Sequence, residues 1–437
     1  MKRIAVLLLS LVALTSAAAL AVACDDETPG TSASPAASSA AQGAVFAETG
    51  APEAPAKGVA DATQQTPASR SLEAPIWDFG FDLLARQAAR TDGNVLVSPA
   101  SLHAVLCMTL NGAQGETAAE MRRALAIEGV DPQTVNQGWA DLIAAAGADE
   151  GAEVRIADSL WLRDGVHFKP AFLTADRDYF AADARALPSD LATSVKEINT
   201  WVERRTGGRI ENLFQQLDPA TVAVLVNTVY VKAGWIGQSF DRKDTGPAPF
   251  TLSGSEQVEV PTMHATFAGP AATTTAFNAV ELQACGEVGV WIVVPRGEQT
   301  PEAVLTSLRA AGPTALWKAS RNTNVDLALP RFHVEYGAAS LPSDLQTMGM
   351  RRAFVAGQAD FGGMADGPLW VGDVVQKTVL DVNEEGVEAA AGSGLVAKGG
   401  WPQGHIEIRA DRPFLVVLTA LRRTQAPLFL AVVRDPR

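Results

Sequence analysis

The sequence predicts an α+β protein with a mixed, largely antiparallel sheet at its centre. Helical patterns lie between residues 77 and 214, whereas most of the strand patterns follow one another from residue 222 to the end. The chain does not alternate regularly between strands and helices, as a doubly wound parallel fold would. Residues 405–437 contain two long apolar runs joined by a polar turn, which is typical of a buried hairpin.

The helices are predicted from the spacing of apolar residues. Residues 77–90 have apolar side chains at helical spacing, as in an amphipathic helix. Residues 95–110 begin as a short strand and continue as a helix that is apolar on most faces and therefore buried. Thr117 and Glu120 form a capping-box pattern at the start of a further helix. Residues 194–214 predict an amphipathic helix that stops at a Gly-Gly pair.

The strands are predicted from short runs rich in β-branched and aromatic residues. They lie at residues 154–162, 222–235, 257–263, 279–282, 289–295 and 324–336.

The first 23 residues have the layout of a secretory signal peptide, with a basic start and an apolar run from Ile4 to Leu14 that is short for a membrane span. Small residues before Cys24 resemble a bacterial lipobox, in which lipid is attached to the cysteine, although Ala21 stands where Leu is common. We therefore expect an exported lipoprotein of the cell envelope. The alternative is cleavage nearby, with Cys24 an incidental thiol and the protein free in the periplasm or the medium.

Residues 24–74 predict a flexible tether. They are rich in Ser, Ala, Pro, Thr and Gly and hold almost no large apolar side chains, so burial could not offset the entropy lost on ordering them. Residues 75–437 hold essentially all of the Trp residues and the periodic apolar runs. No internal linker interrupts this region, which predicts one large domain.

Charge and cysteine content exclude some classes of protein. The formal net charge is −14, which argues against a nucleic-acid partner because phosphates demand a basic surface. Cys107 lies in an apolar run and is expected to be a buried small hydrophobe. Export would permit a disulfide between Cys107 and Cys285, but nothing in the sequence requires one.

Catalytic and metal-binding motifs do not occur in the sequence. No two of the five His residues stand at helical ligand spacing, and the sequence holds no Gly-x-Ser-x-Gly elbow, Ser-x-x-Lys pair or phosphate-binding Gly-Lys-Ser/Thr loop. Gly112 and Gly115 follow a predicted helix rather than a strand, so we interpret them as a structural turn. We expect neither an enzyme nor a cofactor nor a metal, with a hydrolase of dispersed active site as the remaining alternative.

The segment "DVNEEGVEAAAGSGLVAKGGW", residues 381–401, begins as a strand and continues with small residues. Taken as an extended chain from Val387 to Gly399, it places only uncharged and mostly small side chains on one face, and both of its charges, Glu388 and Lys398, on the other. Such a segment can bury one face between strands, yet its Ala and Gly content commits it poorly to a strand on its own.

From Trp77 to Arg437 the sequence resembles the serpin family. "NVLVSPASLHAVLCMTLNGAQGETAAEM" is similar to the family's Asn-x-x-x-Ser-Pro-x-Ser segment, and "EINTWVERRTGGRIENLF" resembles its helix F region. "VLVNTVYVKAGW" resembles the third strand of the main sheet, "DVNEEGVEAAAGSG" the proximal hinge of the reactive loop, and "DRPFLVVL" with "PLFLAVV" the closing strands.

The resemblance implies a serpin fold, with further sheets and surrounding helices and an exposed reactive-centre loop at about residues 384–408. It implies a monomeric inhibitor that is cleaved by a target serine protease, or a cysteine protease, and traps it as a covalent acyl-enzyme while the loop inserts into the central sheet. The native state is then metastable. The alternative is a non-inhibitory serpin that serves as a protease substrate or binding protein.

The resemblance also implies roles for individual residues. Val387 stands where inhibitory members usually carry Thr or Ser, and Gln376 stands where many members have His. The hinge positions are Glu384, Glu385, Gly386, Val387, Glu388, Ala389, Ala390, Ala391 and Gly392, and the shutter and breach positions beneath and beside the opening strands are Ser98, Pro99, Ser101, Asn227, Gln376 and Trp235.

The scissile bond is left among several candidates. Counting seventeen residues from Glu384 in the family's usual spacing places it after Gly400, and counting back from "RPF" places it about two residues later. Lys398 as the residue in the protease's primary pocket implies a trypsin-like target, Trp401 a chymotrypsin-like or subtilisin-like one, and Gly400 an enzyme with a small pocket. Pro402 is the fourth candidate.

Overall fold

A computed structural model describes residues 65–147, 152–219, 221–254, 256–387, 404–419 and 424–437. The chain divides into two units, Met1–Ser38 and Ser39–Arg437, and all the described residues belong to the second. The predicted signal peptide, Cys24, the hinge positions after Val387 and the four scissile-bond candidates lie outside the described residues.

The helices are short and amphipathic or, in one case, buried throughout. They are α1 (Pro67–Ser71), α2 (Glu73–Ala88), α3 (Pro99–Leu110), α4 (Gly115–Ala124), α5 (Pro132–Gly147), α6 (Pro170–Ala175), η1 (Asp176–Phe180), α7 (Leu191–Arg205), η2 (Arg242–Asp244), α8 (Pro301–Ala311), α9 (Ala315–Ala319), α10 (Pro342–Thr347) and η3 (Arg352–Phe354). Every residue of α3 is buried, as its nearly continuous apolar sequence predicts.

The strands form one connected, mainly antiparallel network. They are β1 (Val95–Val97), β2 (Ala152–Arg163), β3 (Asp183–Leu187), β4 (Ala223–Ile236), β5 (Gly246–Thr251), β6 (Gln257–Thr273), β7 (Phe277–Ala284), β8 (Val288–Pro295), β9 (Arg321–Pro330), β10 (Phe332–Ser340), β11 (Asp373–Val382), β12 (Gly386–Val387), β13 (His405–Arg409), β14 (Phe414–Thr419) and β15 (Phe429–Val433).

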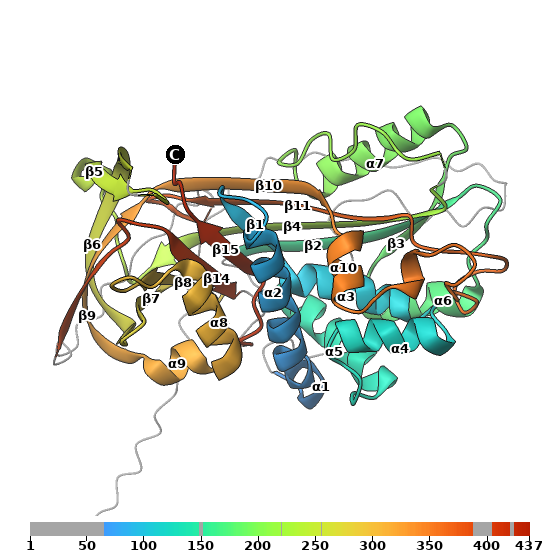
Figure 1. The fold of residues 1–437 in the computed structure, drawn as a ribbon, viewed down its shortest axis with the longest axis horizontal. Coiled ribbons are helices and arrows are strands. Elements are labelled where there is room, and N and C mark those ends of the chain that lie inside the picture. Colours follow the sequence, from blue (N-terminus) through green and yellow to red (C-terminus); the bar gives the residue numbers. More distant parts are fainter. Residues whose placement is uncertain (1–64, 148–151, 220, 255, 388–403, 420–423) are drawn as a thin grey trace, which may run out of the picture. The chain divides into compact units, whose positions relative to one another are not determined.

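The part of the network that concerns function is the central sheet, which we define as β3, β2, β4, β12, β11 and β10 in spatial order. Its long strands run side by side in Figure 1, with α7 over one face and α3 against the other. Side chains of β4 and β11 alternate between two cores. One core lies under α7 and includes Val224, Val226 and Val375, and the other is the main core, which includes Val229, Val231 and Ala233.

A second group of strands, β1, β15, β14, β8, β7, β6, β9 and β13, continues the network from the end of β4, where Trp235 pairs with Ala284. The predicted closing hairpin is confirmed, since β14 and β15 pair antiparallel and all their residues are buried. The run at 324–336, predicted as one strand, forms two strands that are separated at Arg331.

The structure corrects two predictions, the end of the tether at residue 74 and the capping box at Thr117. Residues 65–74, assigned to the tether, include α1 and the first residues of α2, because Thr66 caps α1 and Leu72 is fully buried in the main core. The capping box at Thr117 is also wrong, since Gln114 occupies the N-cap of α4. The Thr117 hydroxyl and the Glu120 carboxylate instead accept backbone N–H groups of Asp360, Arg351 and Arg352.

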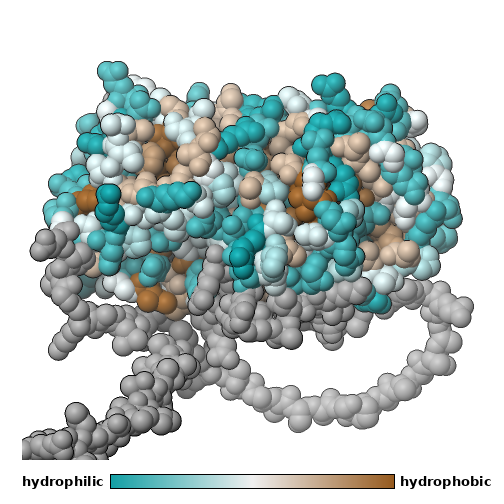
Figure 2. All heavy atoms as spheres, turned by 90° about the horizontal axis from the view of Figure 1, so that it is seen from below, coloured by the Kyte–Doolittle hydropathy of each residue, from teal (hydrophilic) through white to brown (hydrophobic). Residues whose placement is uncertain are grey.

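Among the described residues that are visible in Figure 2, hydrophilic and hydrophobic residues are mixed in small patches, with no extended apolar area. In the described part of the chain, no helix is both long and apolar enough to cross a membrane. Cys107 is buried, as predicted, and no disulfide joins Cys107 to Cys285.

Candidate functional site

The candidate site is the seam between β4 and β11, two neighbouring strands of the central sheet that run parallel. They pair directly over a short stretch, from Val224 opposite Asp373 to Thr228 opposite Lys377. Toward the other end of the seam the two strands no longer pair with each other, because β12 lies between them. The seam is therefore closed by direct pairing in one half and occupied by the start of the loop at its far end.

The two residues of β12 are the first residues of the predicted reactive loop that enter the sheet. Gly386 lies opposite Gly234 and Val387 opposite Ala233 on β4, while Val387 also pairs with Val382 on β11. The Val387 side chain is only 2% exposed and belongs to the main core. The hinge is thus already inserted by two residues.

Gly386 is required where β12 passes β4. A Cβ atom at this position would lie 2.1 Å from the carbonyl oxygen of Ala233 and 2.9 Å from the Cα of Gly234, both of which are backbone atoms that cannot rotate away. The backbone φ of Gly386 is 156°, outside the range that side-chain-bearing residues commonly adopt. A glycine is therefore what allows the loop to enter the seam at this point.

The turn that joins β11 to β12 is held by a buried carboxylate. Glu384 Oε1 accepts hydrogen bonds from Arg331 Nε at 2.7 Å and Nη2 at 2.5 Å, and from Thr245 Oγ1 at 2.5 Å. Burial alone would raise the pKa of Glu384, but these donors outweigh it and hold the pKa below its usual range. Through Glu384, the turn is therefore hydrogen-bonded to Arg331, just before β10, and to Thr245, just before β5.

The backbone of the same turn is held by Trp235. Its indole Nε1 donates to the carbonyl of Asn383 at 2.8 Å, and its backbone N–H donates to the carbonyl of Glu385 at 3.2 Å. Asn383 in turn accepts the N–H of Glu385 on its side-chain oxygen at 2.9 Å. Trp235 was predicted to lie near the point where the loop enters the sheet, and its hydrogen bonds place it there.

The seam is closed lower down by side chains as well as by backbone pairing. Gln376 Nε2, on β11, donates to Asn227 Oδ1, on β4, at 2.8 Å. The same nitrogen donates to the carbonyl of Ser98 at 3.1 Å, and Gln376 Oε1 accepts the Ser98 N–H at 2.9 Å. Asn227 Nδ2 donates to Ser101 Oγ at the start of α3. Ser98, Ser101, Asn227 and Gln376, which the family resemblance named as shutter positions, therefore lie in one hydrogen-bond network, in which Gln376 bridges the two strands.

Four side chains of this site were not foreseen from the sequence: Arg331, Thr245, Arg242 and Asp158. Arg242 forms an exposed ion pair with Glu385. Asp158, on β2, accepts a hydrogen bond from Asn227 Nδ2 at 2.5 Å and is 5% exposed. Period-two alternation in residues 154–162 could have drawn attention to Asp158, because it is a charged residue on a face that otherwise carries Leu160 and Leu162.

The far end of the predicted loop is also fixed in a strand. Residues 405–408, counted within the loop, form most of β13, which pairs parallel with β9. His405 Nε2 lies 3.2 Å from Asp326 Oδ2, and Asp326 Oδ1 accepts a hydrogen bond from Thr266 at 2.8 Å. The loop is thus anchored at both ends, by β12 and by β13.

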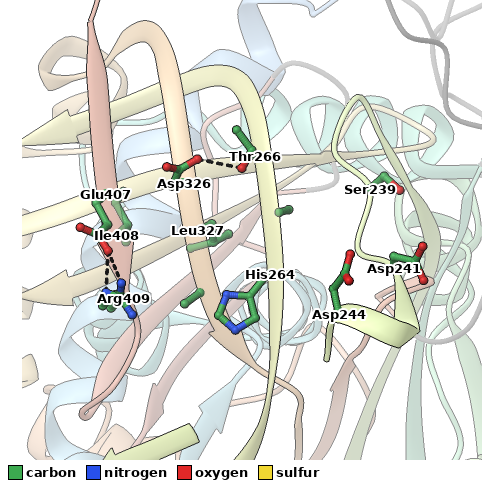
Figure 3. Close-up of a pocket in the computed structure, with 12 residues that line it drawn as sticks. Ser239, Asp241, Asp244, His264, Thr266, Asp326, Leu327, Glu407, Ile408 and Arg409 are labelled. Carbon is green, nitrogen blue, oxygen red and sulfur yellow. Dashed lines mark hydrogen bonds and ion pairs between the residues drawn. The ribbon is translucent and has the colours of Figure 1, made fainter. Parts of the chain in front are cut away.

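A polar groove of about 540 Å³ adjoins β13 (Figure 3). Figure 3 shows Glu407 and Arg409 of β13 on one side and Asp241 and Asp244 on the other, with His264 between them. Glu407 and Arg409 are paired with each other, as are Asp241 and Lys243. Among the described residues no cluster of His, Cys, Asp and Glu could hold a metal ion.

A sequence model of the family described as Serpin (serine protease inhibitor) matches residues 75–436. The chain belongs to the serpin family. A serpin-like protein of Thermococcus kodakarensis is 33% identical over 374 residues, which cover 83% of this chain and 85% of that protein. The leukocyte elastase inhibitor of Bos taurus is 32% identical over 362 residues, covering 79% of this chain and 94% of the inhibitor.

The solved structure of human thyroxine-binding globulin in complex with thyroxine is similar to this serpin with a TM-score of 0.76. The two are 25% identical, and the alignment covers 84% of this chain and 99% of the globulin. The predicted serpin fold, α+β with a large, mainly antiparallel sheet and surrounding helices, is confirmed. The relatives named here include an elastase inhibitor and a thyroxine-binding globulin, so members of the family differ in function.

Proposed function

We propose that this serpin inhibits a serine protease as a single-use suicide substrate. The observation that carries the proposal is β12, which places Gly386 and Val387 inside the seam between β4 and β11. The loop therefore starts in the position from which insertion continues. A cysteine protease is the alternative target, since it also forms an acyl-enzyme.

The register of β12 indicates how far insertion can proceed before the sheet must open. Because Val387 lies opposite Ala233, a continued antiparallel strand would place residue 391 opposite Val229 and residue 392 opposite Thr228. Thr228 is the last β4 residue that pairs directly with β11. Residues 388–391 can therefore join β4 without breaking that pairing, whereas residue 392 and those after it require β4 and β11 to separate.

The sequence of the loop suits this path. In the same register Ala389 and Ala391 would follow Val387 into the main core, opposite Val231 and Val229. Small side chains fit between strands that are already packed, and each inserted residue adds hydrogen bonds on both sides. The gain in burial and in pairing favours the inserted state, so the uncleaved state is metastable.

Cleavage couples this insertion to inhibition. The protease serine attacks the carbonyl carbon of the scissile bond, the peptide bond to the following residue breaks, and the leaving amine takes a proton. The N-terminal part of the loop is then joined to the protease as an ester. Its insertion carries the protease away from β13 and distorts the active site before water hydrolyses the ester. The scissile residue is one of Lys398, Gly400, Trp401 and Pro402.

A non-inhibitory serpin is the second candidate function. Its support is the β-branched Val387 at the first position of the seam and the Gly-rich segments "GSG" and "KGG", which weaken strand formation. Thyroxine-binding globulin, with its bound hormone, is a relative of comparable fold. In this case the loop would be cleaved without capture of the protease.

The experiment that separates these functions is incubation of the protein with trypsin, chymotrypsin and subtilisin, followed by denaturing gels and mass spectrometry. We expect an adduct with the summed mass of protease and serpin, less the released C-terminal peptide, whose mass identifies the scissile bond. A protease whose catalytic serine is replaced by alanine is the control and should give no adduct. Clean cleavage without an adduct would contradict inhibition, and turnover of ester substrates without any protease would indicate a hydrolase.

We further propose that the protein is exported, loses residues 1–23 and is anchored to the cell envelope by lipid on Cys24, with residues 24–64 as the tether of a monomeric inhibitor. The layout of the first residues supports this proposal. Labelling with a fatty-acid analogue in a bacterial host, with Cys24→Ser as the control, should give a lipid-labelled protein only with Cys24. Unlabelled protein in the medium would contradict the anchor.

A further inference from the structure

The two carboxamides that close the seam have every hydrogen-bonding group in use. Gln376 Nε2 donates to Ser98 O and to Asn227 Oδ1, and Gln376 Oε1 accepts from Ser98 N. The two hydrogens of Asn227 Nδ2 go to Ser101 Oγ and to Asp158 Oδ1. Asp158 is therefore one of the acceptors that hold the Asn227 amide with its oxygen toward Gln376. If the amide turned over, its NH₂ would face the NH₂ of Gln376 and the bond across the seam would be lost.

Asp158 is the one ionisable group in this network, which consists of the side chains of Gln376, Asn227, Ser101 and Asp158 and the backbone of Ser98. It is buried, and within the described residues no cation pairs with it. Asn227 on β4 donates to Asp158, and the same amide nitrogen also donates to Ser101 on α3. On its other side, the oxygen of Asn227 accepts from Gln376 on β11. Its surroundings therefore offer neutral hydrogen bonds but no charge to offset ionisation.

Lys377 and Asp183 on the neighbouring strands and Asp141 on α5, which packs on β2, have other partners; Asp141 accepts from Thr66 and Gln137. Lys377, next to Gln376, pairs with Glu335 at 2.7 Å. Asp183, on β3, accepts hydrogen bonds from Trp201 and Arg205 of α7, on the opposite face of the sheet. These groups stay outside the network that surrounds Asp158.

The histidine of α3 does not contribute either. His103 lies on the same helix as Ser101, but its Nε2 bonds the carbonyl of Leu125 and its Nδ1 lies 3.3 Å from Cys107 Sγ. Burial lowers the pKa of His103 to about 4, so its ring stays neutral above pH 5.

We propose that Asp158 is a positioning residue of the seam, and that its proton controls how readily β4 separates from β11. For its effect on loop insertion, this inference rests on the proposed function. In the closed sheet, Asp158 fixes the Asn227 amide that bonds Gln376. Separation of the strands removes Gln376 from Asn227 and admits water to the pair of Asn227 and Asp158.

The direction of the effect follows from proton linkage. Burial raises the pKa of Asp158 to about 7, and the hydrogen bond from Asn227 offsets part of this rise. A carboxyl group in water has a pKa near 3.9, so the closed seam binds the proton more tightly than the opened seam does. Opening therefore releases a proton. It becomes easier as the pH rises from about 4 to about 7, and the effect levels off above that range.

Hydrogen exchange of the full-length chain tests this inference without any protease. The backbone amides of residues 224–228 and 373–377 are followed from pH 5 to pH 8.5, after correction for the intrinsic exchange rate. We expect their protection to fall by about tenfold or more between pH 5 and pH 7.5, because one proton is released on opening. Amides that join β14 to β15, which lie outside the paired stretch of β4 and β11, should show no such change and serve as the internal reference.

Two variants assign the effect to Asp158. Asp158→Asn keeps the shape and an oxygen that accepts from Asn227, and it should abolish the pH dependence and leave the amides protected at all pH values. Asp183→Asn is the matched control and should keep the wild-type profile, since the pKa of Asp183 is held low by Arg205 and Trp201 despite its burial.

A flat profile in the wild-type chain would overturn the inference, as would an unchanged slope in Asp158→Asn. If that variant does not fold, the pH dependence of exchange in the wild-type chain still tests the inference, through the comparison of the seam amides with the amides of β14 and β15. Inhibition is measured separately: absence of a protease adduct would refute the proposed function and leave the exchange result standing, whereas a flat exchange profile would refute the role of Asp158 and leave inhibition standing.

Discussion

Glu384 and Arg331 form a two-pronged contact in which both Nε and Nη2 of the guanidinium donate to Oε1 of the carboxylate. The Glu384 side chain is 4% exposed, whereas the Arg331 side chain is 42% exposed, so a buried carboxylate meets a guanidinium that is partly in water. The contact fixes the turn between β11 and β12. It thereby keeps Gly386 and Val387, the two residues of β12, in the seam. The contact is expected to keep the native loop at a defined depth of insertion.

Replacement of Glu384 by Gln should weaken this contact and lower the free energy of unfolding by about 1–3 kcal/mol, because Arg331 and Thr245 lose a charged acceptor. Urea unfolding followed by tryptophan fluorescence measures the change. Glu385→Gln is the matched control, since its ion pair with Arg242 is exposed and should contribute less than about 1 kcal/mol. Equal losses in the two variants would contradict the role of Glu384.

The same carboxylate predicts a pH dependence. The pKa of Glu384 in the folded protein lies below its usual range, so its stabilising contribution is present above its ordinary pKa and is lost as the pH falls through the folded value. The loss of stability between pH 5 and pH 3 should therefore be smaller in Glu384→Gln than in the wild type. Unfolding midpoints in urea across this range measure it, and identical profiles would show that Glu384 does not contribute.

Replacement of Gly386 by Ala should displace β12 from the seam, because the new methyl group would meet the carbonyl oxygen of Ala233. We expect the variant to remain cleavable but to give a smaller fraction of protease adduct, as insertion starts from a less advanced position. Densitometry of denaturing gels measures the ratio of adduct to cleaved product. Gly129→Ala, where a Cβ meets nothing within 4 Å, is the control and should keep the wild-type ratio.

Replacement of Ala389 by Arg should abolish inhibition and leave the protein cleavable. A strand continued in the register of β12 would bring this side chain after Val387 into the main core. Burial of an unpaired guanidinium there would cost more free energy than insertion of the strand gains. Ala390→Arg is the matched control, because a strand continued in the register of β12 would place this side chain on the other face, on the side of the half-buried Tyr230. Adduct formation should survive in Ala390→Arg at least in part. Equal inhibition by both variants would contradict the proposed register.

Cleavage of the loop should raise the melting temperature, since an inserted strand adds hydrogen bonds and burial to the central sheet. Differential scanning calorimetry of the intact and the cleaved chain measures the shift. Ala389→Arg, cleaved in the same way, should show little or no rise. An unchanged or lower melting temperature for the cleaved wild-type chain would contradict the metastability of the native state.

The sequence predicted the elements that depend on local pattern and missed the contacts that depend on tertiary structure. The buried α3 and the hairpin of β14 and β15 follow from runs of apolar residues, and the structure confirms them. The capping box at Thr117 failed because its hydroxyl bonds Asp360, a residue far along the chain. Propensity for a cap was overridden by a long-range partner.

In the candidate site, too, motifs of the sequence predicted some residues, whereas contacts between distant parts of the chain were missed. Ser98, Ser101, Asn227 and Gln376 were found through motifs of the family, and the structure joins them in one network. Arg331 could not be paired with Glu384 from the sequence, since 53 residues separate them and no local pattern links them. The depth of loop insertion could not be predicted either, because the register of Val387 with Ala233 is set by the turn and its ties to Arg331 and Trp235.

The most direct test of the account is a crystal structure of the chain after cleavage of its loop. The account predicts a new strand between β4 and β11 that continues β12, with Ala389 opposite Val231 and Gly392 opposite Thr228. The bond from Gln376 to Asn227 would then be broken. A cleaved chain in which β4 and β11 still pair from Val224 to Thr228, with that bond intact, would contradict it.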